Sequence, residues 1–135
     1  MGYDLEDGKP ILAHWNDLYS ALIGGVSGSG KSTLVRNILA QSALQRGHFL
    51  ILDKHFGAGE DSLGESLMPL RPCMIADPAS SEREMLDCLG YVKDVGRRRL
   101  AGQEKDHTPL ILVVDETTAL FARSGINEQL GGLNF

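Results

Sequence analysis

A glycine-rich segment from Gly25 to Ser32 combines residue types and a spacing that suit phosphate binding. It reads Gly-Val-Ser-Gly-Ser-Gly-Lys-Ser, which fits the P-loop pattern of Gly, four residues and Gly-Lys-Ser/Thr. Glycines let the backbone turn successive amides toward phosphate oxygens, and the start of a helix adds the positive end of its dipole. The alternative is a flexible glycine loop, which the strand expected before the segment and the helix expected after it disfavour. The pattern therefore predicts a site for a nucleoside triphosphate, with ATP and Mg²⁺ as cofactors.

Individual residues of this segment have distinct expected roles. Lys31 is expected to reach the terminal phosphates as a point charge and to take part in catalysis, and the Ser32 hydroxyl is expected to complete part of the magnesium shell. Thr33 is expected to support the same turn. The residues expected to contact the nucleotide are Gly25, Ser27, Gly28, Ser29, Gly30, Lys31, Ser32 and Thr33.

A second pattern is an apolar run that ends in two carboxylates. Residues 110–114 are followed by Asp115 and Glu116, the form of a Walker B strand, whose aspartate holds the magnesium shell opposite the P-loop serine. Glu116 is the candidate catalytic base, because activating the attacking water requires a carboxylate within hydrogen-bond reach. The alternative is a solvated acidic turn at the end of a core strand. Together with the P-loop, the pattern favours hydrolysis, with Asp115 as the metal-side carboxylate.

Two further charged runs have open interpretations. Asp53 ends another apolar run and is a candidate to contact the magnesium shell or to sense the γ-phosphate; a loop of solvated charges is the alternative. The run Arg97-Arg98-Arg99 could contact DNA or a neighbouring subunit's nucleotide, whereas cations near a helix C-terminus also stabilise the helix dipole. The 4 histidines and 2 cysteines lack metal-ligand spacing, so no metal cluster is expected.

The apolar pattern predicts alternating strands and helices around these motifs. Short apolar runs predict strands at 21–23, 49–52, 73–76 and 110–114. Helical spacing predicts one helix from Ser32 to a stop at Gly47, and a second that starts with a capping box of Ser81 and Glu84. A hairpin is expected around Asp7-Gly8, and a mixed loop over 57–72. This order predicts an α/β sheet with parallel crossovers, whose ligands bind beyond the carboxyl ends of the strands.

Bulk composition narrows the class of protein. The 135 residues suffice for one modest domain. Apolar residues make up 42% and charged residues 23%, the mix of an ordinary globular protein. The sequence has neither a signal peptide nor a membrane-spanning run, so the cytoplasm is the expected compartment, and membrane association would need segments outside this chain. A net charge of −5 neither demands nor excludes DNA.

Three stretches together resemble the FtsK/HerA family of DNA-pumping ATPases: Leu-Ile-Gly-Gly-Val-Ser-Gly-Ser-Gly-Lys-Ser-Thr at 22–33, Leu-Ile-Leu-Asp-Lys-His at 50–55 and Leu-Val-Val-Asp-Glu at 112–116. The resemblance spans Gly8 to Leu120. It implies a three-layer P-loop NTPase fold of the RecA-like class with a mainly parallel sheet. It also implies a hexameric ring around double-stranded DNA, with ATP bound between subunits beside an arginine from the neighbour. In this family the second strand often ends Asp-Pro-Lys-Gly or Asp-Pro-His-Gly, whereas this chain has Asp-Lys-His-Phe-Gly at 53–57.

The resemblance further implies a strand between the P-loop and Walker B strands that carries a polar sensor residue. The chain ends at Phe135, which leaves room after Asp115 for a helix from Glu116 to Arg123 and a tail through Gly131-Gly132. We therefore expect an N-terminal hairpin segment at 1–20 and a partial P-loop ATPase core at 21–135 that is incomplete at the C-terminus, as in a fragment, a truncated reading frame or a degenerate motor.

The functional expectation is ATP binding and hydrolysis within an FtsK/HerA-like double-stranded DNA translocase motor that acts as a homo-oligomer. Two alternatives stay open: a non-cycling ATP-binding fragment or degenerate module, and a type IV secretion or conjugation ATPase. A small-molecule kinase or GTPase is disfavoured because no Asn-Lys-x-Asp guanine reader occurs. An ABC transporter ATPase is disfavoured because Gln-Leu-Gly-Gly at 129–132 matches its signature poorly.

Overall fold

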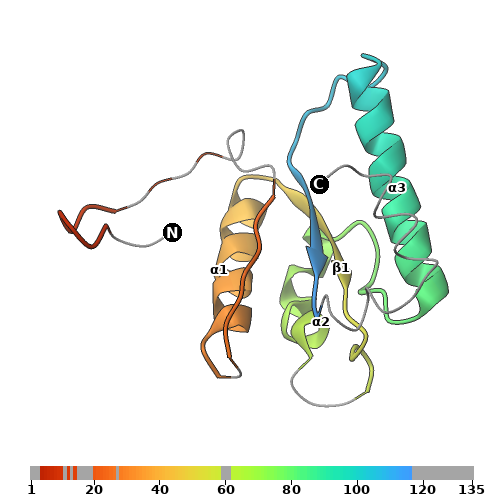
Figure 1. Cartoon of the computed structure of the whole chain (residues 1–135). Helices are drawn as coiled ribbons and strands as arrows, with labels where there is room; N and C mark the ends of the chain where they lie inside the picture. Colours follow the sequence, from red (N-terminus) through yellow and green to blue (C-terminus); the bar gives the residue numbers. More distant parts are fainter. Residues whose placement is uncertain are drawn as a thin grey trace.

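The computed structural model describes residues 4–10, 12, 14, 20–26, 28–58 and 62–116. The helices and strands in these ranges are, in chain order, α1 (Lys31–Leu44), β1 (His48–Leu52), α2 (Leu63–Ser66), the 3₁₀ helix η1 (Met68–Cys73), α3 (Glu82–Leu100) and β2 (Leu110–Val114). Figure 1 shows α1 and α3 on opposite sides of the two strands. None of the described helices combines the length and the apolar character that a membrane crossing requires.

The two strands form a parallel pair in which β1 is the inner strand. β1 pairs with β2 residue for residue, so that Leu52 lies opposite Val114. On its other edge β1 makes single parallel bridges to Met74 and Ala79. Four of its five residues are buried, whereas every residue of β2 is half-buried. In the part of the chain that the structure describes, β1 is the sole strand partner of β2.

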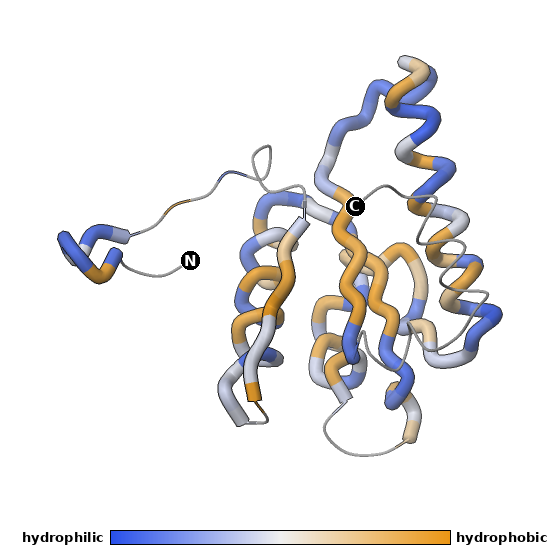
Figure 2. The backbone as a smooth tube through the Cα atoms, viewed as in Figure 1, coloured by the Kyte–Doolittle hydropathy of each residue, from blue (hydrophilic) through white to orange (hydrophobic). Residues whose placement is uncertain are grey.

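Side chains that alternate along the strands divide the core into two layers, because successive strand residues point to opposite faces of a sheet. The layer that contains Leu39 of α1 holds the odd-numbered strand residues Phe49, Ile51, Ile111 and Val113. The layer that contains Leu89 of α3 holds the even-numbered strand residues Leu50, Leu52, Leu112 and Val114. Figure 2 shows the strands as a continuous hydrophobic stretch between the helices. Helices therefore cover both faces of the sheet.

α1 runs antiparallel to β1, which brings its first turn to the end of the sheet where the strands finish. The connection is short: the Gly47 N–H donates to the Ser42 carbonyl at 2.8 Å, and a Cβ at Gly47 would collide with the Ser42 hydroxyl. The chain thus reverses at once and packs Leu39 against the odd-numbered face of β1. Figure 1 shows the first turn of α1 at the same end as the carboxyl ends of β1 and β2.

α3 begins with the capping box that the sequence predicts. The Ser81 hydroxyl accepts from the Glu84 N–H at 3.3 Å, and the Glu84 carboxylate accepts from the Ser81 N–H at 2.9 Å. The backbone donors of Ser81 and Ser80 hold the pKa of Glu84 below its usual value. The prediction of this helix start is confirmed, and Met85 and Leu89 of its first turns are buried against the sheet.

Other predicted elements are confirmed in part. The strands predicted at 49–52 and 110–114 are β1 and β2, and the helix predicted from Ser32 is α1. The strand predicted at 73–76 is reduced to one bridge at Met74, because the chain reaches β1 there directly from η1. The mixed loop predicted at 57–72 contains α2 and most of η1.

The strand predicted at 21–23 does not form. Leu22 in its centre is 89% exposed, and none of the described strands pairs with this segment. A strand persists through ladder hydrogen bonds to a neighbour, and among the described residues this segment pairs with neither β1 nor β2. Figure 1 draws the segment as coil that leads into α1.

A turn forms at Asp7-Gly8, where the sequence predicts a hairpin, and the hairpin itself stays a prediction. The Gly8 N–H donates to the Asp4 carbonyl at 2.9 Å, and the Asp4 N–H donates to the Lys9 carbonyl at 2.8 Å. Gly8 has a φ of 68°, which favours glycine at this place. Tyr3 and Ile11, on the arms of the predicted hairpin, lie outside the described residues. The same is true of the helix predicted up to Arg123, beyond its first residue, and of the tail that follows it.

Candidate nucleotide-binding site

The P-loop sequence forms a tight turn ahead of α1. The Ser29 N–H donates to the Val26 carbonyl at 3.2 Å. Gly28 has a φ of 77° and Gly30 a φ of 89°, in a region that residues with a Cβ rarely adopt. At Gly25 a Cβ would collide with the Ser29 hydroxyl. Glycine is therefore required by the backbone of this loop at positions 28 and 30.

Lys31 and the start of α1 face this loop. The Lys31 ammonium donates to the Gly25 carbonyl at 2.6 Å and to the Val26 carbonyl at 2.8 Å, so the loop closes around the side chain that follows it. Gly30 is the N-cap of α1, and the helix has neither a capping side chain nor an acidic residue in its first turn. First-turn amides have no intrahelical acceptor, and the helix dipole favours anions there. Amides and a cation thus converge on a place suited to phosphate.

Asp115 extends the pairing of β1 and β2 by one step. Its N–H donates to the Leu52 carbonyl at 2.9 Å, and the strand register continues to place it opposite Asp53. Asp115 belongs to the odd-numbered series that faces α1, the helix of the P-loop. Burial raises the pKa of Asp115, and the negative charges of Asp53 and Glu116 raise it further. A carboxylate in this setting gains from a nearby cation.

Glu116 follows in a left-handed backbone conformation and contacts a histidine. Its φ is 51°, a region that costs a residue with a Cβ on the order of 1 kcal/mol or more. Its Oε2 lies 2.9 Å from His55 Nε2. The hydrogen bond that the His55 ring donates to Glu116, together with the negative charge of Glu116, raises the pKa of His55. Each side chain is 55% exposed, so solvent reaches the pair.

Asp53 organises the loop after β1. It is 0% exposed, its Oδ1 accepts from the His55 N–H at 2.9 Å, and its Oδ2 accepts from the Gly64 N–H at 2.8 Å. The first bond anchors the backbone of His55, and the second ties the start of α2 to the end of β1. The alternative of a solvated charge is therefore wrong for Asp53. Both of its oxygens bind backbone amides, which makes this carboxylate an internal anchor.

The two halves of the predicted site are the P-loop with the start of α1 and the carboxylates that follow β2. They lie at the same end of the sheet and, among the residues described, do not contact each other directly. Ser32 and Thr33 are exposed in the first turn of α1, and Ser27 lies outside the described residues. Across the described ranges, no hydrogen bond or ion pair joins Lys31 or Ser32 to the carboxylates that follow β2. A bound ligand with its cation would have to bridge the two halves.

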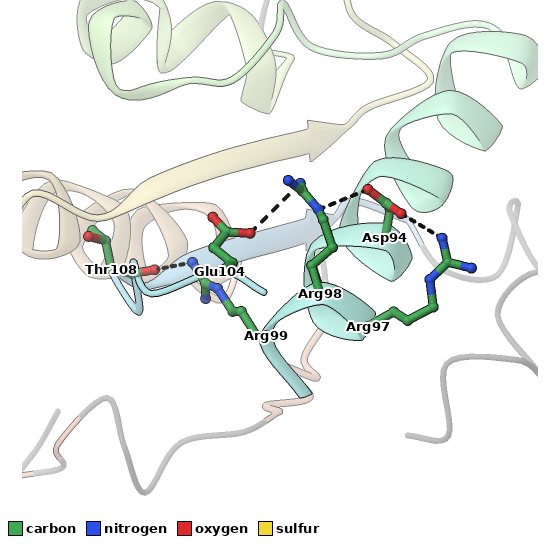
Figure 3. Close-up of polar contacts among 6 residues, drawn as sticks. All are labelled: Asp94, Arg97, Arg98, Arg99, Glu104 and Thr108. Carbon is green, nitrogen blue, oxygen red and sulfur yellow. Dashed lines mark hydrogen bonds and ion pairs between the residues drawn. The ribbon is translucent and has the colours of Figure 1, made fainter. Parts of the chain in front are cut away.

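Three arginines at the C-terminal end of α3 contact neighbouring groups (Figure 3). The pairs are Arg97 with Asp94, Arg98 with Asp94 and Glu104, and Arg99 with the Thr108 carbonyl. The Arg99 guanidinium donates to that carbonyl at 2.9 Å, which fastens the connection before β2 to the helix end. This geometry agrees with stabilisation of the helix terminus. It adds no support to a contact with DNA or with a neighbouring nucleotide.

Comparison with known proteins assigns no family to the chain, so any function must be argued from its own residues. No family model, curated protein or solved structure matches the chain. Within the described ranges, no group of three or more His, Cys, Asp or Glu is arranged to hold a metal ion. The predicted magnesium site needs no such group, because it combines the Ser32 hydroxyl with the Asp115 carboxylate.

Sequence reasoning missed His55 as a member of this region. The residue stands close after the end of β1, and the carboxyl ends of parallel neighbouring strands meet at one edge of a sheet. The position of His55 just after β1 was therefore the signal from which the sequence could have predicted its place in this region. Its pairing with Glu116 depends on the register of β1 and β2, which the sequence pattern does not specify.

Proposed function

We propose that this chain binds magnesium ATP through the P-loop Gly25–Ser32 and hydrolyses it with Glu116 as the base. The observation that carries the proposal is the shape of the loop. Glycines in left-handed conformations lead into a helix start without a capping side chain, and the loop closes around the Lys31 ammonium. The helix that follows packs on the sheet face to which Asp115 belongs.

The residues present fit a nucleotide and its metal ion. Lys31 would exchange its two carbonyl partners for phosphate oxygens, because an ammonium group binds an anionic oxygen more strongly than a neutral carbonyl. Ser32 and Asp115 would hold the magnesium ion, whose charge offsets that of the terminal phosphates. The raised pKa of Asp115 reflects burial beside other carboxylates, which a cation there would counteract. Glu116 would accept the proton of the attacking water.

The wider role that we propose is that of the ATPase core of an FtsK/HerA-like motor that moves double-stranded DNA, working in the cytoplasm as a homo-oligomeric ring. Its support is the resemblance of three sequence stretches. The layered packing of α1 and α3 on opposite faces of a parallel pair accords with the three-layer P-loop architecture that the resemblance implies. A type IV secretion or conjugation ATPase shares the same support.

The test of nucleotide binding is calorimetry with magnesium ATP on the full chain. We expect Lys31→Ala to weaken binding at least about tenfold, or about 1.4 kcal/mol, because it removes the cation of the loop. Lys93→Ala is the matched control, since Lys93 is exposed on α3. Equal affinity of the Lys31→Ala variant and the wild type would reject the assignment. If binding is found, the proposed motor function is tested by measuring whether double-stranded DNA stimulates phosphate release.

A non-cycling ATP-binding module is the second candidate function. It is favoured by the contact of Glu116 Oε2 with His55 Nε2 at 2.9 Å, which occupies one oxygen of the proposed base. In that case calorimetry would show binding, and a phosphate-release assay would show none. Release that Glu116→Gln abolishes would exclude this candidate.

A further inference from the structure

The segments that follow β1 and β2 are joined by a side-chain contact beyond the last main-chain hydrogen bond between the two strands. The last main-chain bond runs from the Asp115 N–H to the Leu52 carbonyl at 2.9 Å. Beyond it, His55 Nε2 lies 2.9 Å from Glu116 Oε2. The second contact connects the proposed catalytic base to a residue of the other strand end, and the proposed nucleotide contacts do not include that residue.

His55 is held in place by the loop beneath it. Asp53, at 0% exposure, accepts the His55 N–H at 2.9 Å and the Gly64 N–H at 2.8 Å. Because both oxygens of this buried carboxylate are bonded, the backbone of His55 is tied to the end of β1 and to the start of α2. The imidazole is therefore presented from a fixed support even though its ring is 55% exposed.

Glu116 requires such a support to act as a base. Its side chain is 55% exposed and has several rotatable bonds, whose freedom opposes any single orientation. Among the described residues, His55 is the partner of Oε2, and Oε1 has no hydrogen-bond partner. A carboxylate held through one oxygen keeps the other available to accept a proton.

We infer that His55 is a positioning residue, whose ring holds Glu116 Oε2 and leaves Oε1 free for the water that attacks ATP. The inference rests on the proposed hydrolysis and adds the residue that orients its base. Both the cationic imidazole and the neutral tautomer with its proton on Nε2 can donate this hydrogen bond. Removal of the ring would leave the nucleotide contacts of the P-loop in place and would release the carboxylate.

The test compares His55→Ala with His55→Gln, whose side-chain amide restores a hydrogen-bond donor. His107→Ala is the matched control, because His107 is exposed in the connection before β2, at the opposite end of that strand. We expect His55→Ala to lower kcat about tenfold or more, as misplacement of a catalytic group does, with KM and magnesium-ATP affinity unchanged. We expect His55→Gln to recover most of kcat, and His107→Ala to match the wild type.

The contact itself can be measured without turnover, from the ring-nitrogen resonances of ¹⁵N-labelled histidine. Glu116→Gln should shift the His55 Nε2 resonance and leave that of His107 in place; an unshifted His55 resonance overturns the inference. The inference is also overturned if His55→Ala has the same kcat as the wild type, or if His55→Gln is as slow as His55→Ala. Binding of ATP by the wild type without phosphate release overturns it as well. If the wild type gives no binding heat while the His55 shift is present, the proposed function fails and the contact stands.

Discussion

Replacement of Asp53 by asparagine separates a structural from a catalytic role for the carboxylate at the end of β1. Asp53 is completely buried, and its two oxygens accept the His55 N–H and the Gly64 N–H at 2.9 and 2.8 Å. Asparagine has nearly the same shape but a single acceptor oxygen. Its NH₂ group would face one of the two amide donors, and that donor would lose its acceptor.

The size of the effect follows from these two hydrogen bonds. Leaving a buried donor without an acceptor costs about 1–3 kcal/mol, and the bond that asparagine retains loses its charge assistance. We therefore expect Asp53→Asn to lower the free energy of unfolding by about 2–3 kcal/mol, and Asp53→Ala, which removes both acceptors, by about 3–5 kcal/mol. Since domains are stable by only about 5–15 kcal/mol, either loss is large.

Urea denaturation followed by circular dichroism measures this difference. Asp87→Asn is the matched control, because Asp87 is exposed on α3 and accepts none of the hydrogen bonds described; its effect should stay within about 0.5 kcal/mol. Magnesium-ATP affinity, measured where Asp53→Asn is folded, should remain near that of the wild type. A variant as stable as Asp87→Asn, or a large loss of affinity without a loss of stability, would refute the anchoring role and favour a place in the magnesium shell.

Three further predictions test the loop, the cap and the histidine pair. Gly30→Ala forces a side chain into a φ of 89° and should cost about 1–2 kcal/mol in the loop, which would appear as about tenfold weaker ATP binding. Gly90→Ala is the contrasting variant: Gly90 lies in mid-helix with open space around it, and this change should stabilise the protein by about 0.5–1 kcal/mol. Ser81→Ala removes the cap of α3 and should lower the free energy of unfolding by about 1 kcal/mol, which an unchanged urea midpoint would contradict. The hydrogen bond to Glu116 raises the pKa of His55 from 6.5. The protonated ring therefore contributes to stability, and this contribution is complete below the unfolded pKa and is lost as pH rises through the folded pKa. An NMR titration should place the midpoint above 6.5 and show Glu116→Gln lowering it; equal midpoints in the two proteins would argue against the pair.

Elements with strong local signals could be predicted from the sequence. The helix after the P-loop, the capping box at Ser81 and the apolar runs that become β1 and β2 all appear where the pattern places them. Each signal is local, because periodicity and capping involve residues a few positions apart. The glycines of the P-loop belong to the same class, since positive φ at Gly28 and Gly30 is a property of the loop itself.

Contacts between distant segments were decided by the tertiary structure. The run at 21–23 has the composition of a strand, yet it forms none, because a strand also needs a neighbour to pair with, and local composition does not specify one. The sequence leaves Asp53 open between a contact to the magnesium shell or γ-phosphate and a solvated charge, whereas in the structure α2 folds back and gives its buried carboxylate a second amide donor.

The sequence alone therefore specifies a glycine-rich loop with the P-loop pattern, a pair of carboxylates after an apolar strand and the helices around them. The register of β1 on β2 specifies what these groups touch: it sets Asp115 opposite Asp53 and places His55 against Glu116. Composition leaves that register open, since all five residues of β2 are apolar and pairing energy depends on neighbours that only the folded chain brings together.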